Sequence, residues 1–294
     1  MSMSFCKRLF SNMTKDIKFP SVSHRKVKRF YKDVSIVKSE KTKIKPEKEY
    51  TQSKSHVNWR VSHSDQYYEI YLDRFSGKSL YKDEMLIPSY PLAIALAEEW
   101  AYQPAKPHYL NPRSMKLNTL MAQAIRTEND ENLQKYLKKT ITEILGCDQV
   151  CFQEDPRQLN PVKNQLAHDQ RERGEPLLKF MKDKYGMSLN VFTDFGFMGQ
   201  DPSYLKIKDV LEETDPYVLL SIFNIASSTK STMVALALLN EEISLEDAII
   251  VSRLEELYQQ KFYGVVEGAH DYDEARTISD VAAAKNFITL LSNE

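Results

Sequence analysis

The sequence predicts an α+β protein in which a small β-rich unit is followed by a larger helical bundle. Apolar and polar residues alternate with a period of two in residues 57–61 and 67–73, which is typical of half-buried strands. From Asn111 onward the apolar residues instead repeat with the helical period. The 294 residues include only 8 glycines and 12 prolines, and so few breakers favour long helices.

These patterns divide the chain into three parts. Residues 1–28 form a basic N-terminal arm, residues 29–110 a small α+β domain, and residues 111–294 an all-helical domain. Within the small domain, residues from about 38 to 66 are rich in Lys, Ser and Glu, so we interpret them as a polar insertion. A hydrophobic content of 42% is ample for the core of one or two domains.

The elements of the small domain follow in order. Residues 32–37 are expected to form a short strand, and the two alternating segments named above are expected to form further strands. The sequence FSGKSLY, residues 75–81, reads as a turn in which Gly77 takes a positive φ. Ser89 is expected to cap a helix that runs to about Gln103.

The helical domain shows a series of apolar stripes. Gly146, Gly186 and Gly264 each follow such a stripe and are expected to end a helix. Ser244 with Asp247 resembles a capping box at the start of the helix that ends at Gly264. Residues 187–192 suggest an isolated strand. The remaining expected helices are Leu133–Ile144, Pro176–Tyr185, Leu205–Leu211, Tyr217–Ala226, Thr232–Leu239 and Ile278–Leu291.

Charge is distributed unevenly along the chain. Residues 1–60 carry 16 Lys and Arg against 5 Asp and Glu, whereas the remainder carries 24 against 36. The arm is also rich in Ser and contains scattered apolar residues, which is the profile of a mitochondrial targeting segment. A nucleic-acid-binding arm and a plain disordered tail are the alternatives. The acidic remainder argues against nucleic acid as a partner.

Several classes of chemistry lack their sequence motifs. Neither phosphate-binding pattern GxxxxGK[ST] nor GxGxxG occurs, and GxSxG and HExxH are also absent. Three cysteines are too few for a disulfide framework, and Cys147 with Cys151 has no second pair for zinc. The richest apolar run, Val218–Ile225, is far shorter than the roughly 18–20 residues of a membrane span. We expect no cofactor, no metal and no stable membrane insertion.

One acidic cluster leaves an enzymatic alternative open. Glu267 and His270 match half of a di-iron bundle motif, and Asp271 lies beside them. The other histidines have no glutamate three residues earlier, so the second half of the motif is missing. A metal-dependent or acid/base enzyme that uses these three residues remains the alternative. Otherwise Glu267 and His270 lie in a loop, and Asp271 or Asp273 caps the final helix.

The preceding helix carries a glutamate pair. Glu255 and Glu256 are adjacent and therefore point about 100° apart, so they cannot act as a carboxylate dyad. Ser252, Glu255 and Gln259 form a polar seam beside a stripe that we expect to be buried. Such an acid can serve at the rim of a protein interface. The members of the stripe are Leu254, Leu257, Tyr258 and Phe262.

An ordered set of segments resembles a known family. The sequence SRLEELYQ, a following glycine and the residues EGAHDYD resemble the signature of the F1-ATPase assembly chaperones that attend the mitochondrial α subunit. The resemblance extends from Arg29 through most of the chain. Its further segments are KRFYKDVSI, YEIYLD, LIPSYPLAIALAEEWAYQ, CDQVCFQ and STKSTMVALAL.

The chain departs from the family pattern in ways that suggest a divergent member. Ser79-Leu80 stands where the family usually has Thr-Pro, and the insertion has no family counterpart. Trp59 and Trp100 are the only tryptophans. Family tryptophans are replaced by Gly174, Phe180, Tyr263 and Gly268.

The resemblance implies a binding protein rather than an enzyme. It predicts a monomeric chaperone of the mitochondrial matrix that holds unassembled F1 α subunit until the β subunit displaces it. It marks Glu255 as the residue on which client handling depends, with Glu256 and Gln259 as its neighbours in the client-binding set. Trp100 matches a position important to folding or function. The remaining candidate positions are Tyr263, Gly264, Glu267, His270 and Asp271.

Overall fold

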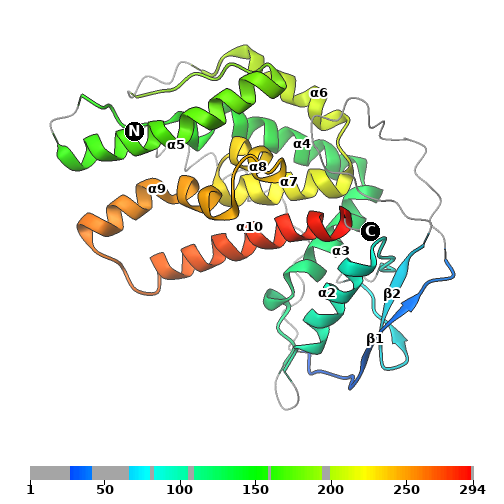
Figure 1. The fold of residues 1–294 in the computed structure, drawn as a ribbon. Coiled ribbons are helices and arrows are strands. Elements are labelled where there is room, and N and C mark those ends of the chain that lie inside the picture. Colours follow the sequence, from blue (N-terminus) through cyan, green and yellow to red (C-terminus); the bar gives the residue numbers. More distant parts are fainter. Residues whose placement is uncertain are drawn as a thin grey trace.

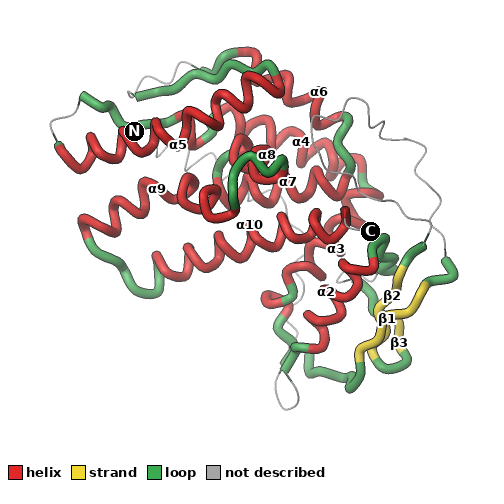
Figure 2. The backbone as a smooth tube through the Cα atoms, viewed as in Figure 1, coloured by secondary structure: helices red, strands yellow, loops and turns green. Residues whose placement is uncertain are grey.

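The computed structural model has a small sheet at one end and a body of helices beyond it (Figure 1). It describes residues 27–41, 66–79, 83–104, 109–157, 160–193 and 199–292. The expected strand at 57–61, most of the insertion at 38–66 and most of the arm at 1–28 lie outside the described residues. The α+β class and the order of a sheet followed by helices are confirmed (Figure 2).

The sheet is antiparallel, with the order β1-β2-β3. Ile36 of β1 lies opposite Ile70 of β2, and Ile70 is buried against the helices because alternate residues of β2 face the core. The sheet consists of β1 (Val34–Lys38), β2 (Tyr68–Leu72) and β3 (Phe75–Ser76).

The prediction that Gly77 supplies the positive φ in this hairpin is wrong. Asp73 takes that conformation, with φ 54°. Its carboxylate accepts the N–H groups of Lys32 at 3.0 Å and Asp33 at 2.8 Å from the segment before β1, and Asp is one of the few residue types other than Gly that adopt the left-handed region. Gly77 is needed for a different reason, because a Cβ there would lie 3.1 Å from the Ile70 carbonyl oxygen.

Helix α2 (Tyr90–Ala101) joins the sheet to the helical body. Ser89 caps it as predicted, since its Oγ accepts the N–H of Leu92. The same hydroxyl donates to the carbonyl of Leu290 in the last helix at 2.5 Å. Ile70, Leu92 and Leu291 belong to one continuous buried cluster, so the sheet and the helices share a core. The boundary near residue 110 stays a prediction.

The helical body contains the predicted helices in order, with two corrected starts and one helix, α3 (Lys116–Asn129), that was not predicted. The predicted start at Pro176 is wrong, because α5 begins at Pro161, capped by Asn160, and runs through Pro176. The predicted start at Ile278 is also wrong, because α10 begins at His270. In place of a strand at 187–192, Phe192 forms a single bridge with Phe152. The helices are α3 (Lys116–Asn129), α4 (Glu131–Gly146), α5 (Pro161–Tyr185), α6 (Ile207–Glu212), α7 (Pro216–Thr229), α8 (Thr232–Leu239), α9 (Leu245–Tyr263) and α10 (His270–Ser292), with 3-10 turns at Pro112–Ser114, Gln149–Cys151 and Pro202–Lys206.

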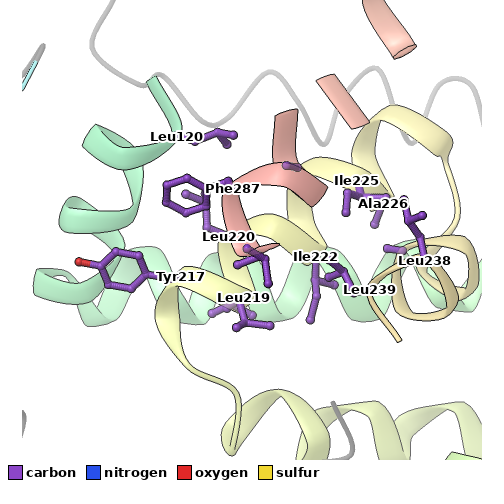
Figure 3. Packing of buried hydrophobic residues seen from close by; sticks show 14 of the residues in the cluster. Leu120, Tyr217, Leu219, Leu220, Ile222, Ile225, Ala226, Leu238, Leu239 and Phe287 are labelled. Carbon is purple, nitrogen blue, oxygen red and sulfur yellow. The ribbon is translucent and has the colours of Figure 1, made fainter. Parts of the chain in front are cut away.

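Helices α7 and α8 form the centre of the core. All residues of α8 are buried, and α7 packs against α3, α4, α8 and α10 (Figure 3). Tyr217 of α7 stacks on Phe287 of α10, with ring centroids 6.3 Å apart. Among the described residues, no helix combines the length and apolar composition needed to cross a bilayer.

A buried carboxyl group, Asp148, ties the middle of the chain to α8. Its two oxygens accept the N–H groups of Val150 and Met233, each at 3.1 Å. Burial raises the pKa of Asp148 to about 6, although the Ser231 hydroxyl and these N–H donors act in the opposite direction. This carboxyl is a structural feature that the sequence analysis did not single out.

Candidate functional site: the α9–α10 hairpin

The predicted site residues from Glu255 to Asp271 all lie on one helical hairpin. Helices α9 and α10 run in opposite directions and are joined by a short turn at the edge of the molecule (Figure 1). Ser244 begins α9 through the predicted capping box, because its Oγ accepts the Asp247 N–H at 3.0 Å and donates to the Asp247 carboxylate at 2.7 Å.

The hairpin turns at a glycine that another residue could replace only with strain. Gly264 ends α9 as predicted, and its N–H donates to the Gln260 carbonyl at 3.0 Å. Its backbone has φ 86° and ψ 168°, a combination that is essentially restricted to glycine. Gly268, with φ 75°, provides a second positive φ within the same turn. The two glycines therefore fix the path of the chain between the helices.

His270 closes the turn rather than lying free in a loop, which corrects the predicted loop position. It is the first residue of α10, and its Nδ1 accepts the N–H of Val266 at 3.2 Å. Its own N–H donates to the Val266 carbonyl at 3.2 Å. Glu267 and Asp271 are exposed on either side. Because His270 Nδ1 is already used as an acceptor, its contacts are those of a structural cap.

The metal-dependent alternative finds no support in this geometry. Among the described residues, the side chains that lie close enough together to share an ion are His168, Asp169 and Glu172 on α5. They lie on one helix, with His168 and Glu172 exposed, and Asp169 also accepts the Tyr258 hydroxyl at 2.5 Å. Glu267, His270 and Asp271 do not form such a group.

A buried arginine that the sequence analysis missed holds the hairpin together. Arg253 is 3% exposed, and its Nη1 lies 3.0 Å from the Asp273 carboxylate and 3.3 Å from that of Glu256. Its Nη2 lies 3.7 Å from Glu274. Asp273 and Glu274 belong to α10, so the guanidinium crosslinks the two helices. The signal was present in the sequence as Arg253 and Glu256 at helical spacing.

The two glutamates of the pair make different contacts, as helical geometry requires. Glu256 is bound within the fold, because it pairs with Arg253 and lies 3.4 Å from the Lys230 ammonium. Glu255 is half-buried and accepts the Gln259 amide at 3.2 Å, while Gln259 is exposed. Of the two acids, Glu255 is therefore the one that belongs to the polar seam. The seam reaches the surface at Gln259.

The stripe beside this seam is buried at one end and exposed at the other. Leu254 and Tyr258 are buried and pack with Leu166 of α5. Burial, together with the hydrogen bond to Asp169, raises the pKa of Tyr258 to about 12. The prediction that Phe262 is buried is wrong, because it is 43% exposed. The stripe is therefore covered where Leu254 and Tyr258 pack against α5 and exposed at Phe262, near the tip of the hairpin.

Trp100 lies at a different place and makes packing contacts. Its indole N–H donates to Asn118 of α3 at 2.9 Å, and its carbonyl accepts the Tyr31 hydroxyl at 2.7 Å. The Tyr31 ring meets it edge to face at 5.7 Å. The helix that carries Trp100, α2, is well separated from the hairpin turn (Figure 1). These contacts fix α2, α3 and the segment before β1 to one another.

The chain matches the family described as ATP12 chaperone protein over residues 28–182, which is more than half of its length, and it belongs to that family. The matched residues end within α5, so the hairpin lies beyond them.

Solved structures extend the likeness of the fold to nearly the whole chain. Atp12 from Paracoccus denitrificans is 21% identical, with a TM-score of 0.70, over 90% of this chain and 99% of that one. The Atu1473 protein from Agrobacterium tumefaciens is 22% identical, with a TM-score of 0.71, over 99% of both chains. Both alignments show a shared fold that includes the helical body.

Proposed function

We propose that the protein is an assembly chaperone of the mitochondrial matrix that binds unassembled F1-ATPase α subunit. The observation that carries this proposal is membership of the ATP12 chaperone family, whose description as a chaperone accords with an assembly role. The α subunit as client follows from the ordered sequence segments that end in the hairpin. The matrix location follows from the basic, serine-rich arm.

A chaperone that holds a client subunit needs only a surface that competes with the client's final partner. A subunit without its partner exposes an apolar interface that promotes aggregation. A chaperone that covers this interface lowers the concentration of the exposed form by mass action and needs no nucleotide hydrolysis. The incoming β subunit then displaces it, provided that β binds the same interface more tightly. In this proposal the protein acts as a monomer with one client chain.

Glu255 gives the sharpest test of the client-binding set. Its carboxylate is half-buried on the seam with Gln259, and a Lys there reverses the charge presented to a client. Glu255→Lys is expected to abolish co-purification of the α subunit while the melting temperature stays nearly unchanged. The matched control is Glu175→Lys, because Glu175 is an exposed glutamate on α5.

The two variants separate a contact effect from a general charge effect. The control is expected to retain full co-purification. Retention of the client by Glu255→Lys would remove Glu255 from the binding set. Loss of the client by both variants would instead show that overall charge, and not this seam, governs binding. A wild-type protein that never retains the α subunit would contradict the proposed client itself.

A further inference from the structure

Large apolar side chains are gathered at the tip of the hairpin. Sixteen such side chains are exposed in the described part of the chain, and five of them lie within the eleven residues from 262 to 272. Tyr263 is 82% exposed, and Val265 and Val266 are 60% and 59% exposed. We call these five residues the apolar tip: Phe262, Tyr263, Val265, Val266 and Tyr272.

The apolar tip is held in a defined shape. Gly264 and Gly268 set the turn, and His270 forms hydrogen bonds to both the N–H and the carbonyl of Val266. Beneath the turn, the Arg253 guanidinium joins α9 to α10 and also lies 3.5 Å from the His270 carbonyl. An apolar surface that is ordered before binding loses little conformational entropy when a partner covers it.

The charges around the apolar tip are mainly acidic. Glu267 and Asp271 are exposed beside it, and within the described residues neither forms a salt bridge. The neighbouring cation, Lys261, lies 5.5 Å from the Phe262 ring and 5.8 Å from the Tyr258 ring. A partner that carries Lys or Arg next to apolar side chains complements this surface, whereas an anionic membrane is repelled by it.

We propose that the apolar tip docks a segment of a partner protein in which apolar side chains are flanked by Lys or Arg. The identity of the partner, the α subunit, rests on the proposed function. The chemistry of the docking segment does not, because it is inferred from the apolar tip itself. Tyr263 fits the role of an anchor, because a rigid aromatic ring with a polar end contributes strongly at protein interfaces. Glu267 and Asp271 then form an acidic rim that selects basic flanks.

The test compares a tip variant with a matched surface variant. The tip variant combines Tyr263→Ser, Val265→Ser and Val266→Ser, and the single change Tyr263→Ser accompanies it. The control is Tyr102→Ser, because Tyr102 at the end of α2 is 83% exposed, as Tyr263 is 82%. All these side chains are exposed, so unchanged circular dichroism and melting are expected.

Each protein is titrated against two kinds of probe. One is purified F1 α subunit, and the other is a pair of fluorescent amphipathic peptides, one of leucine and lysine and one of leucine and glutamate. The wild type is expected to bind the α subunit and the lysine peptide. The tip variant is expected to lose at least about tenfold in affinity for both, which is the usual scale for removing an interface anchor. The control is expected to bind as the wild type does.

The outcomes distinguish this inference from the proposed function. If the tip variant binds both probes as well as the wild type does, the docking surface is refuted and the client assignment stands. If the wild type ignores the α subunit but binds the lysine peptide through the tip, the client is refuted and the docking surface stands. Equal binding of the glutamate peptide, or tip-dependent binding to phosphatidylcholine vesicles, would overturn the partner chemistry.

Discussion

Replacing Arg253 by methionine is expected to loosen the α9–α10 hairpin while leaving the rest of the fold intact. The side chain of Arg253 is 4% exposed and meets three carboxylates, of which Asp273 is the nearest at 3.0 Å. A hydrogen bond to a charged group contributes about 1.5–3 kcal/mol. The Asp273 carboxylate is 57% exposed, so its contribution falls in the lower part of that range. The other two contacts, at 3.3 and 3.7 Å, are longer and add little.

The expected change in the free energy of unfolding depends on which interactions of the arginine methionine keeps and which it removes. Methionine keeps most of the apolar volume of the arginine stem, so the cost of a cavity is small. The carboxylates that lose their partner can turn to water because they are partly exposed. We therefore expect a loss of about 2 kcal/mol, which is below the roughly 3–5 kcal/mol for breaking a fully buried ion pair because the carboxylates here are partly exposed.

The assay combines global and local measurements. Denaturant unfolding gives the total loss, and hydrogen exchange of residues 260–274 is expected to accelerate about thirtyfold, the factor equivalent to 2 kcal/mol. Arg276→Met is the control, because Arg276 is 64% exposed and lies 3.6 Å from Asp280. Equal stability and equal exchange in the two variants would refute the role assigned to Arg253.

Two further predictions concern a backbone position and a titrating group. Gly264→Ala is expected to lower the free energy of unfolding by about 1–3 kcal/mol, because φ 86° with ψ 168° strains any residue with a Cβ; an unchanged value would show that the turn relaxes freely. For Asp148, the pKa is about 6 in the folded protein against the ordinary 3.8, so the protonated group favours folding most below about pH 4. This contribution, about 3 kcal/mol at 1.36 kcal/mol per pKa unit, is lost as the pH rises through 6. Comparison of the unfolding free energies of wild type and Asp148→Asn at pH 4 and pH 7 is expected to show this loss in the wild type only, and parallel pH profiles would contradict it.

Local signals in the sequence predicted the elements that local chemistry determines. Helix α9 begins at a Ser244 capping box and ends at Gly264, and both features depend on residues within one turn. The strand around Ile70 followed from period-two alternation, and its neighbour around Ile36 was also predicted as a short strand. In these helices and strands, the residues that carry the sequence signal are the same residues that form the element.

The remaining features depend on contacts between distant segments. Arg253 could be assigned only once α10 was known to begin at His270, which places Asp273 and Glu274 opposite it. The start of α5 was missed because its first half is charged and buries few side chains, such as Leu166. The positive φ at Asp73 required two backbone donors that another segment of the chain supplies.

The structure was also needed to separate the site residues that support the fold from those that are exposed for contact with a client. The sequence marked Glu255 and Glu256 together, but the fold binds Glu256 to Arg253 and Lys230. It likewise marked His270 as a candidate ligand, whereas its ring accepts a backbone N–H. Helical periodicity placed Phe262 on a buried stripe, because periodicity alone does not show which residues of a stripe a neighbouring element covers.

The most direct test of the central claim is a measurement of α-subunit aggregation by light scattering in the presence of an equimolar amount of this protein. The account predicts suppressed scattering, an equimolar complex on size exclusion, and release of the protein when the β subunit is added. Unchanged scattering and separate elution of the two chains would contradict it.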